Sequence, residues 1–252
     1  MEKSEKFVIK PNIPENTVSL MIVSGEFPEI YQSLTKYTAV EKSSLYIKFR
    51  KAEAYHPDMQ VNYLGSGKIV CADNCGMKER LKNIGLTVIE HQFGNTNEIA
   101  YPSNIALNCM ILGEYVVGKL SGTSQIIKNW CEEHGYKFIN VKQGYTKCSV
   151  AIVDESSVIT ADESIYNALY NKIDVLKIRP GYIQLPGCNY GFIGGCCGLI
   201  DKNVLAFSGD IKKHPDANKI IDFLKARNIE YVNLTDNELL DVGSIIPIKE
   251  RI

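Results

Sequence analysis

Short apolar runs alternate with polar turns and amphipathic stretches along most of the chain, and their order repeats. Each repeat predicts a strand, a tight turn, a second β-branched strand, a helix and a third strand. Val70, Val116, Val158 and Val204 occupy equivalent places on the second strands, so the spacings between repeats are 46, 42 and 46 residues. A period of this length is typical of a repeat architecture built from one supersecondary unit.

The fourth repeat shows its helix most clearly. Ile220 and Leu224 lie one helical turn apart, which places them on one face of a predicted helix over 216–227. Pro215 stands just before this helix, where a missing N–H is harmless. In the first complete repeat, Gly85 follows the last helical residue and is expected to end the helix with a positive φ.

The two ends of the chain each hold part of a fifth repeat. Residues 19–26 resemble residues 203–210, because both run from an apolar strand through Ser-Gly-acid into a helical stretch. The N-terminal part therefore predicts a second strand, a helix over about 28–37 and a third strand near 38–41. Residues 243–248 form a lone strand that supplies the missing piece. Pairing the two ends closes a ring and removes exposed sheet edges.

The predicted fold class is therefore α/β: a five-bladed α/β-propeller of ββαβ repeats, closed by pairing the N- and C-terminal segments. We expect residues 1–252 to form one domain. The alternative is an ordinary three-layer α/β domain with a parallel sheet. The blades are expected at 243–252 together with 18–42, and at 56–90, 101–141, 145–178 and 189–234.

Composition narrows the class of protein. Lys and Arg number 28 and Asp and Glu 29, so the net charge of −1 gives no general attraction to nucleic acid or anionic lipid. The longest clean apolar run, 18–23, is too short to span a bilayer. Four of the first six residues are charged, and the segment lacks the apolar core of a signal peptide. We expect a cytoplasmic protein whose eight cysteines are reduced, with no nucleic-acid or membrane partner.

Residues 101–107 and 114–118, a strand with the hairpin that follows it, are the stretch of the chain that most specifically matches a known family. Together with the five repeats, one of them split across the two ends, they resemble the pentein fold, which is the α/β-propeller of the guanidino-group-modifying enzymes. The resemblance implies a cysteine on the last strand that attacks a guanidinium carbon, a histidine that shuttles protons, and acidic residues that hold the substrate.

The chain departs from that pattern at each of these places. The last strand reads Ser-Ile-Ile-Pro over 244–247, without a cysteine. Tyr145 and Lys147 stand near the place of the histidine, and Asn104 stands where a substrate-holding aspartate is expected. The chain is therefore identified as a divergent member of the superfamily, which also includes a non-enzymatic relative, the ribosome anti-association factor.

The residues that lead into the first strands are expected to converge at one end of the ring. His56 and Asp58 are two apart, so on an extended chain their side chains leave the same face. A carboxylate beside an imidazole favours its charged form, as a proton shuttle needs. The pair is also suited to a zinc or iron ion, or to a purely structural hydrogen bond. We expect His56 and Asp58 to be catalytic, with no metal and no other cofactor.

The other candidates come from the same starts of strands. Asn104, Tyr145, Lys147 and Asp241 are expected to bind substrate. Cys188 follows a Pro-Gly turn and is the preferred nucleophile, although an inert loop thiol is the alternative.

The remaining cysteines are interpreted as structural. Cys71 and Cys75 lack the second close pair that a four-cysteine zinc site needs. Cys196 and Cys197 lie in a glycine-rich strand that is expected to pack near the axis. Buried apolar positions are expected for three others: Cys109, Cys131 and Cys148.

Two functions remain open from the sequence. The first is an enzyme of the hydrolase or amidinotransferase kind, acting on C–N bonds of a small guanidine, amidine or amide metabolite. The second is a non-catalytic member of the fold that binds a ligand or a macromolecule. A small-molecule ligand is expected in the first case, and the sequence predicts no oligomeric state.

Overall fold

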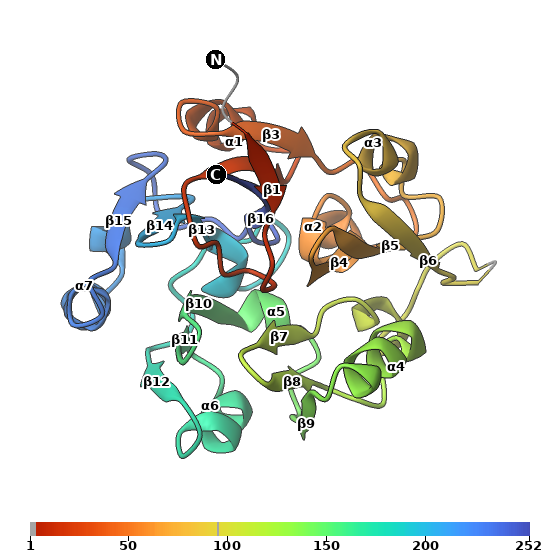
Figure 1. Ribbon diagram of the computed structural model, residues 1–252. Coiled ribbons are helices and arrows are strands. Elements are labelled where there is room, and N and C mark those ends of the chain that lie inside the picture. The colour runs from red at the N-terminus through yellow and green to blue at the C-terminus, as the bar shows by residue number, and fades with distance from the viewer. Residues whose placement is uncertain (1–3, 95) are drawn as a thin grey trace.

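The described residues form five small sheets around a central axis (Figure 1). The computed structural model describes residues 4–94 and 96–252. In each sheet an antiparallel pair of strands is followed by a helix and by a strand parallel to the second strand. This is the predicted ββαβ unit, and the α/β-propeller fold class is confirmed.

Four of the blades are continuous in sequence. The first contains β4 (Val61–Gly65), β5 (Lys68–Ala72), α3 (Lys78–Asn83) and β6 (Thr87–His91). The next contains β7 (Met110–Leu112), β8 (Tyr115–Gly118), α4 (Gln125–Glu133) and β9 (Lys137–Asn140). The third contains β10 (Val150–Asp154), β11 (Ser157–Thr160), α6 (Glu163–Leu169) and β12 (Asp174–Lys177). The fourth contains β13 (Cys197–Asp201), β14 (Val204–Phe207), η4 (Ile211–Lys213), α7 (Ala217–Lys225) and β15 (Glu230–Asn233).

The fifth blade joins the two ends of the chain, as predicted. Strand β16 (Ile246–Arg251) runs antiparallel to β2 (Val18–Val23), with Ile246 opposite Ile22, and β3 (Ala39–Lys42) lies parallel to β2 after helix α1 (Pro28–Leu34). Strand β1 (Glu5–Phe7), which the sequence analysis did not predict, pairs with the other edge of β16. The ring is thus closed in a four-stranded sheet.

A single helical turn precedes the first strand in each of the four continuous blades. These turns are α2 (Pro57–Gln60), η2 (Ser103–Ile105), α5 (Thr146–Ser149) and η3 (Gly194–Cys196), and a further turn, η1 (Lys51–Glu53), precedes α2. The prediction that these segments are extended was wrong, because short apolar runs fit a strand and a buried helical turn equally well. Candidate side chains such as Asp58 and Lys147 therefore project from helical turns close to the axis.

The axis itself is closely packed. A Cβ added to Gly195 would lie 1.9 Å from Asp241 Oδ1, and one on Gly198 would lie 2.0 Å from the carbonyl oxygen of Ile245. This agrees with the expectation that small residues allow the glycine-rich segment to approach the axis. The longer helices α1, α3, α4, α6 and α7 lie on the outside of the ring (Figure 1), and no helix among the described residues is long and apolar enough to cross a bilayer.

Residues 8–16, here called the N-terminal strap, cross the centre of the ring in the view of Figure 1. Tyr63 donates a hydrogen bond to the carbonyl oxygen of Val8 (2.7 Å). The fully buried carboxylate of Glu250 accepts hydrogen bonds from the backbone N–H groups of Glu15 (2.6 Å) and Asn16 (2.7 Å). The strap is therefore fixed to β4 and β16 rather than lying loosely over the ring.

Candidate functional site

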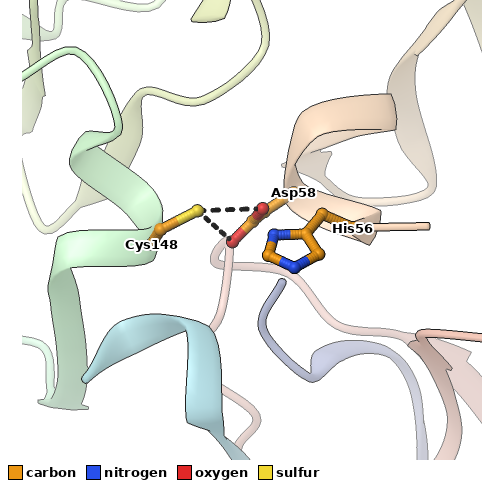
Figure 2. A group of neighbouring side chains, drawn as sticks. All are labelled: His56, Asp58 and Cys148. Carbon is orange, nitrogen blue, oxygen red and sulfur yellow. Dashed lines mark hydrogen bonds between the residues drawn. The ribbon is translucent and has the colours of Figure 1, made fainter. Parts of the chain in front are cut away.

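Asp58 lies at the centre of a buried polar cluster. Its side chain projects from α2 and the residue is 1% exposed. The Cys148 thiol donates to the Asp58 carboxylate, at 3.1 Å from each oxygen (Figure 2), and the Ser244 hydroxyl donates to Oδ2 at 2.5 Å. These partners come from different blades, and residues 90 and 186 positions apart in sequence meet here.

Lys147 and Ser244 extend the cluster. Lys147 is 8% exposed, and its Nζ donates to Ser244 Oγ at 3.2 Å. Ser244 Oγ also lies 2.9 Å from the carbonyl oxygen of Gly194. Ser244 is fully buried, and its φ of +71° is a backbone conformation that residues other than glycine rarely adopt. The last-strand segment, where the resemblance implied a cysteine, thus contributes the hydroxyl of Ser244 to the polar cluster.

Asn108 connects two of the helical turns. Its Oδ1 accepts hydrogen bonds from the backbone N–H groups of Lys147 (3.0 Å) and Cys148 (3.3 Å). Its Nδ2 donates to the carbonyl oxygen of Asp58 (3.1 Å) and lies 3.1 Å from Cys148 Sγ. The fully buried Asn108 therefore fixes the thiol against the carboxylate.

His56 and Asp241 form the other side of the cluster. His56 precedes α2, is 3% exposed, and places Nδ1 3.9 Å from Asp241 Oδ1. The Asp241 carboxylate accepts hydrogen bonds from the backbone N–H groups of Phe192 (2.9 Å) and Gly243 (3.0 Å). Nε2 of His56 is buried and has no hydrogen-bond partner among the described residues. We call this set the polar centre: His56, Asp58, Asn108, Lys147, Cys148, Asp241 and Ser244.

Burial controls the protonation states in the polar centre. Loss of water, followed by the negative charge of Asp58, raises the pKa of the Cys148 thiol well above its ordinary value. The thiol therefore stays protonated near neutral pH and is a donor rather than a nucleophile. Burial also raises the pKa of Asp241, and the neighbouring His56 opposes this effect.

Asn104 and Tyr145 belong to a second group of contacts. The amide of Asn104 donates to the Tyr145 hydroxyl oxygen (2.8 Å) and to Glu53 Oε2 (3.1 Å), and the Tyr145 hydroxyl donates to Glu53 Oε1 (3.0 Å). The Arg50 guanidinium is paired with the same Glu53 carboxylate. Burial, and then the charge of Glu53, raises the pKa of Tyr145 to about 12, so its hydroxyl stays protonated. We call these four residues the outer cluster.

Aromatic rings continue from the outer cluster across the neighbouring strand starts. Tyr145 stacks between Tyr101 and Phe192, with ring centroids 6.2 and 6.3 Å apart. Tyr190 meets the edge of Phe192 at 6.2 Å. Tyr101 and Tyr190 are 48% and 43% exposed, so flat aromatic surface is open to solvent beside the outer cluster.

Cys188 belongs to neither cluster, although it borders Arg50 of the outer cluster. It is exposed, and it lines a surface cavity of about 270 Å³ together with Arg50, Lys51 and Ala52. Among the described residues, no imidazole or carboxylate is hydrogen-bonded to its thiol. The predicted site residues thus occupy three places: His56, Asp58, Lys147 and Asp241 meet in the polar centre, Asn104 and Tyr145 in the outer cluster, and Cys188 on the surface.

Four important residues were missed from the sequence. Cys148 and Ser244 look like ordinary core and strand residues, and Glu53 lies outside the predicted blades. Asn108 carried a usable signal, because it is a polar residue inside the otherwise apolar run 105–112.

Comparisons with known proteins agree with the architecture. Residues 22–246 match the model of a family of unknown function, DUF6873. No curated protein sequence matches the chain significantly. Among solved structures, the inosamine-phosphate amidinotransferase StrB1 of Streptomyces griseus has a TM-score of 0.60 at 9% identity, covering 96% of this chain and 97% of that one.

Two further structures are similar over nearly their whole length. SxtG, an amidinotransferase of the saxitoxin biosynthetic pathway from Microseira wollei, has a TM-score of 0.57 at 13% identity, covering 93% and 96% of the two chains. A DDAH mutant from Pseudomonas aeruginosa in complex with citrulline has a TM-score of 0.54 at 9% identity, covering 94% and 100%. At these identities the likeness shows the fold, which is the predicted pentein fold.

Proposed function

The chain belongs to the DUF6873 family, and from the geometry of its outer cluster we propose that it binds a small molecule bearing a guanidinium or amidinium group. One observation carries this proposal. The 5% exposed Glu53 already holds a guanidinium, that of Arg50, while Tyr145 and Asn104 orient its carboxylate. A planar cation of the same shape would find the same acceptor.

The surroundings of Glu53 favour a flat cation. The Tyr101 ring already accepts a cation, since Nζ of Lys119 lies 4.5 Å from its centroid, and the Arg50 side chain, 58% exposed, can swing into solvent to make room. The similar structures add support, since two are amidinotransferases and another is the agmatine deiminase of C. jejuni. For this chain, that substrate class remains our proposal.

Hydrolysis of a C–N bond is the second candidate, and one observation favours it. Arg50 both pairs with Glu53 and lines the cavity beside Cys188, so a ligand on Glu53 would lie near an exposed thiol. The Cys188 thiolate would add to the guanidinium carbon, an amine would leave with a proton, and water would release the product from sulfur. Because no base contacts this thiol among the described residues, we favour binding over turnover.

Calorimetric titration with methylguanidinium, acetamidinium and the neutral isostere methylurea tests the proposal. The two cations should bind and methylurea should not. Glu53→Gln should weaken methylguanidinium binding by about 10- to 100-fold, because it removes hydrogen bonds to a charged group. Glu114→Gln, at an exposed ion pair with Lys137, is the matched control and should leave the affinity unchanged.

Equal affinity for methylurea, or unchanged binding by folded Glu53→Gln, would rule out the proposed recognition. Release of amine or ammonia from either cation, lost in Cys188→Ser, would instead establish the second candidate. Circular dichroism on both glutamate variants separates a lost contact from a lost fold.

A further inference from the structure

The polar centre contains a group of side chains whose chemistry the proposed guanidinium binding does not use. His56, Asp58 and Cys148 each offer one ligand atom, and these three atoms lie within 4.8 Å of one another. Figure 2 shows the imidazole and the thiol facing the same carboxylate. We propose that these three residues form a zinc site inside the ring.

The set of donors points to zinc. Imidazole nitrogen, carboxylate oxygen and thiolate sulfur are the ligands that Zn²⁺ takes in proteins, with bonds of about 2.0–2.3 Å. At tetrahedral angles such bonds place the ligand atoms roughly 3.3–3.8 Å apart. Cys148 Sγ already lies 3.1 Å from both oxygens of Asp58, so only small side-chain movements separate the present geometry from a coordinated one.

An unpartnered atom independently indicates a missing ligand. Nε2 of His56 is buried without a hydrogen-bond partner among the described residues, in a residue that is 3% exposed. A buried polar atom in this condition destabilises the folded protein by about 1–3 kcal/mol. Coordination of an ion through Nε2, after rotation of the ring, would remove the need for that hydrogen bond.

Formal charges in the polar centre also match a divalent ion. The carboxylates of Asp58 and Asp241, when ionised, exceed the single positive charge of Lys147 by one. Binding of Zn²⁺ forms the zinc–sulfur bond, breaks the S–H bond of Cys148 and releases that proton to solvent, which adds one positive charge in total. The buried group then has no net charge, as expected for a site away from water.

The residues around the three ligands are arranged as an outer shell. Asn108 Nδ2 lies 3.1 Å from Cys148 Sγ, Ser244 donates to Asp58, and the Asp241 carboxylate lies beside the His56 ring. Such contacts orient metal ligands. A cavity of about 10 Å³ borders the carboxylate ligand Asp58 and also Lys147 and Asn62, though neither His56 nor Cys148, and it has room for about one water molecule.

Metal content and cobalt spectroscopy on the whole chain test this inference. Protein stripped with a chelator and titrated with Zn²⁺ should bind one ion per chain and release one proton near neutral pH. Co²⁺ in place of zinc should give a sulfur-to-cobalt charge-transfer band in the near ultraviolet. Cys148→Ser should abolish that band and weaken Zn²⁺ binding at least tenfold.

A buried pair of thiols away from the polar centre supplies the matched control. The sulfur atoms of Cys71 and Cys75 lie 3.5 Å apart and are the rival soft-metal site. Cys71→Ser should keep the cobalt band and the zinc affinity within about twofold. Should Cys148→Ser fail to fold, His56→Gln in its place must weaken zinc binding at least tenfold.

Three results would overturn the inference: wild-type protein that binds no Zn²⁺ at micromolar concentrations, a cobalt spectrum without a sulfur band, or a band lost in Cys71→Ser and kept in Cys148→Ser. Methylguanidinium binding is measured separately on Glu53, so failure of the zinc site and failure of the proposed function are distinguishable.

Discussion

Replacing Arg50 by alanine should tighten the binding of methylguanidinium about sixfold. In the free protein the Arg50 guanidinium is paired with Glu53, and its NH2 group lies 3.2 Å from the Tyr145 hydroxyl oxygen. A ligand that uses Glu53 must displace this internal guanidinium first. The apparent dissociation constant therefore includes the free energy of opening the Arg50–Glu53 pair.

The exposures of the two partners set the size of the effect. The Glu53 side chain is 6% exposed and the Arg50 side chain 58% exposed, so solvent screens one end of the pair. Exposed ion pairs contribute about 0–1 kcal/mol, and we take about 1 kcal/mol because Glu53 itself is buried. This favours the closed form about fivefold and leaves about one sixth of the molecules ready to bind, which is the predicted sixfold change.

Titration calorimetry measures the affinity of each variant. The buffer contains 0.15 M salt, because the Debye length of about 8 Å at this ionic strength suppresses long-range effects of net charge. Lys51→Ala is the control, because it removes the same charge from an exposed neighbour that lines the same cavity. If Arg50→Ala and Lys51→Ala change the affinity equally, or if Arg50→Ala weakens binding, Arg50 is not an internal competitor.

Two further predictions concern reactivity and stability. Cys188, the exposed cysteine of the described chain, should be alkylated in the native protein within minutes, whereas the buried thiols should react only on unfolding. Mass spectrometry after iodoacetamide treatment measures the labelling of each cysteine. Early labelling of Cys148 would contradict its burial. Hydrogen bonds from Arg179 lower the pKa of Asp216 to about 2, below its ordinary value of 3.8. The ionised Asp216 therefore stabilises the folded protein by up to about 2 kcal/mol, after allowance for the exposed arginine. This stabilisation is present above pH 4 and is lost as the pH falls toward 2. Asp216→Asn should flatten this dependence in urea unfolding at pH 6 and pH 3, and an unchanged pH dependence would show that the pair does not stabilise the fold.

The ring could be predicted from the sequence because the pattern of apolar strands, turns and helices repeats along the chain. The equivalent positions of Val70, Val116, Val158 and Val204 do lie on the second strands. The Ser-Gly-acid likeness between residues 19–26 and 203–210 identified the N-terminal part of a fifth repeat, and its predicted pairing with the C-terminal strand is confirmed. The helical turns before the first strands were not predictable, since four buried residues carry no distinguishable period. Strand β1 was also missed, because three residues at an edge give too little pattern.

The candidate site was less predictable because its contacts are long-range. His56, Asp58, Lys147 and Asp241 could be expected to converge, since each leads into a first strand of the ring. Which neighbour turns its side chain inward is decided by the geometry of each helical turn. Cys148 therefore meets Asp58 although the pattern around it, Lys-Cys-Ser-Val-Ala, is that of a buried structural thiol.

The polar centre follows from the fivefold layout rather than from any one motif. Asp58, Asn108, Cys148, Gly194 and Ser244 come from five successive blades, each from the segment just before a first strand, and all take part in one hydrogen-bond network. The fold supplies the five positions, and their side chains decide the chemistry. A thiol, a carboxylate, an amide and a hydroxyl at these positions, with an imidazole beside them, form a set of metal ligands and hydrogen-bond donors, whereas a deprotonated nucleophile would need a different set.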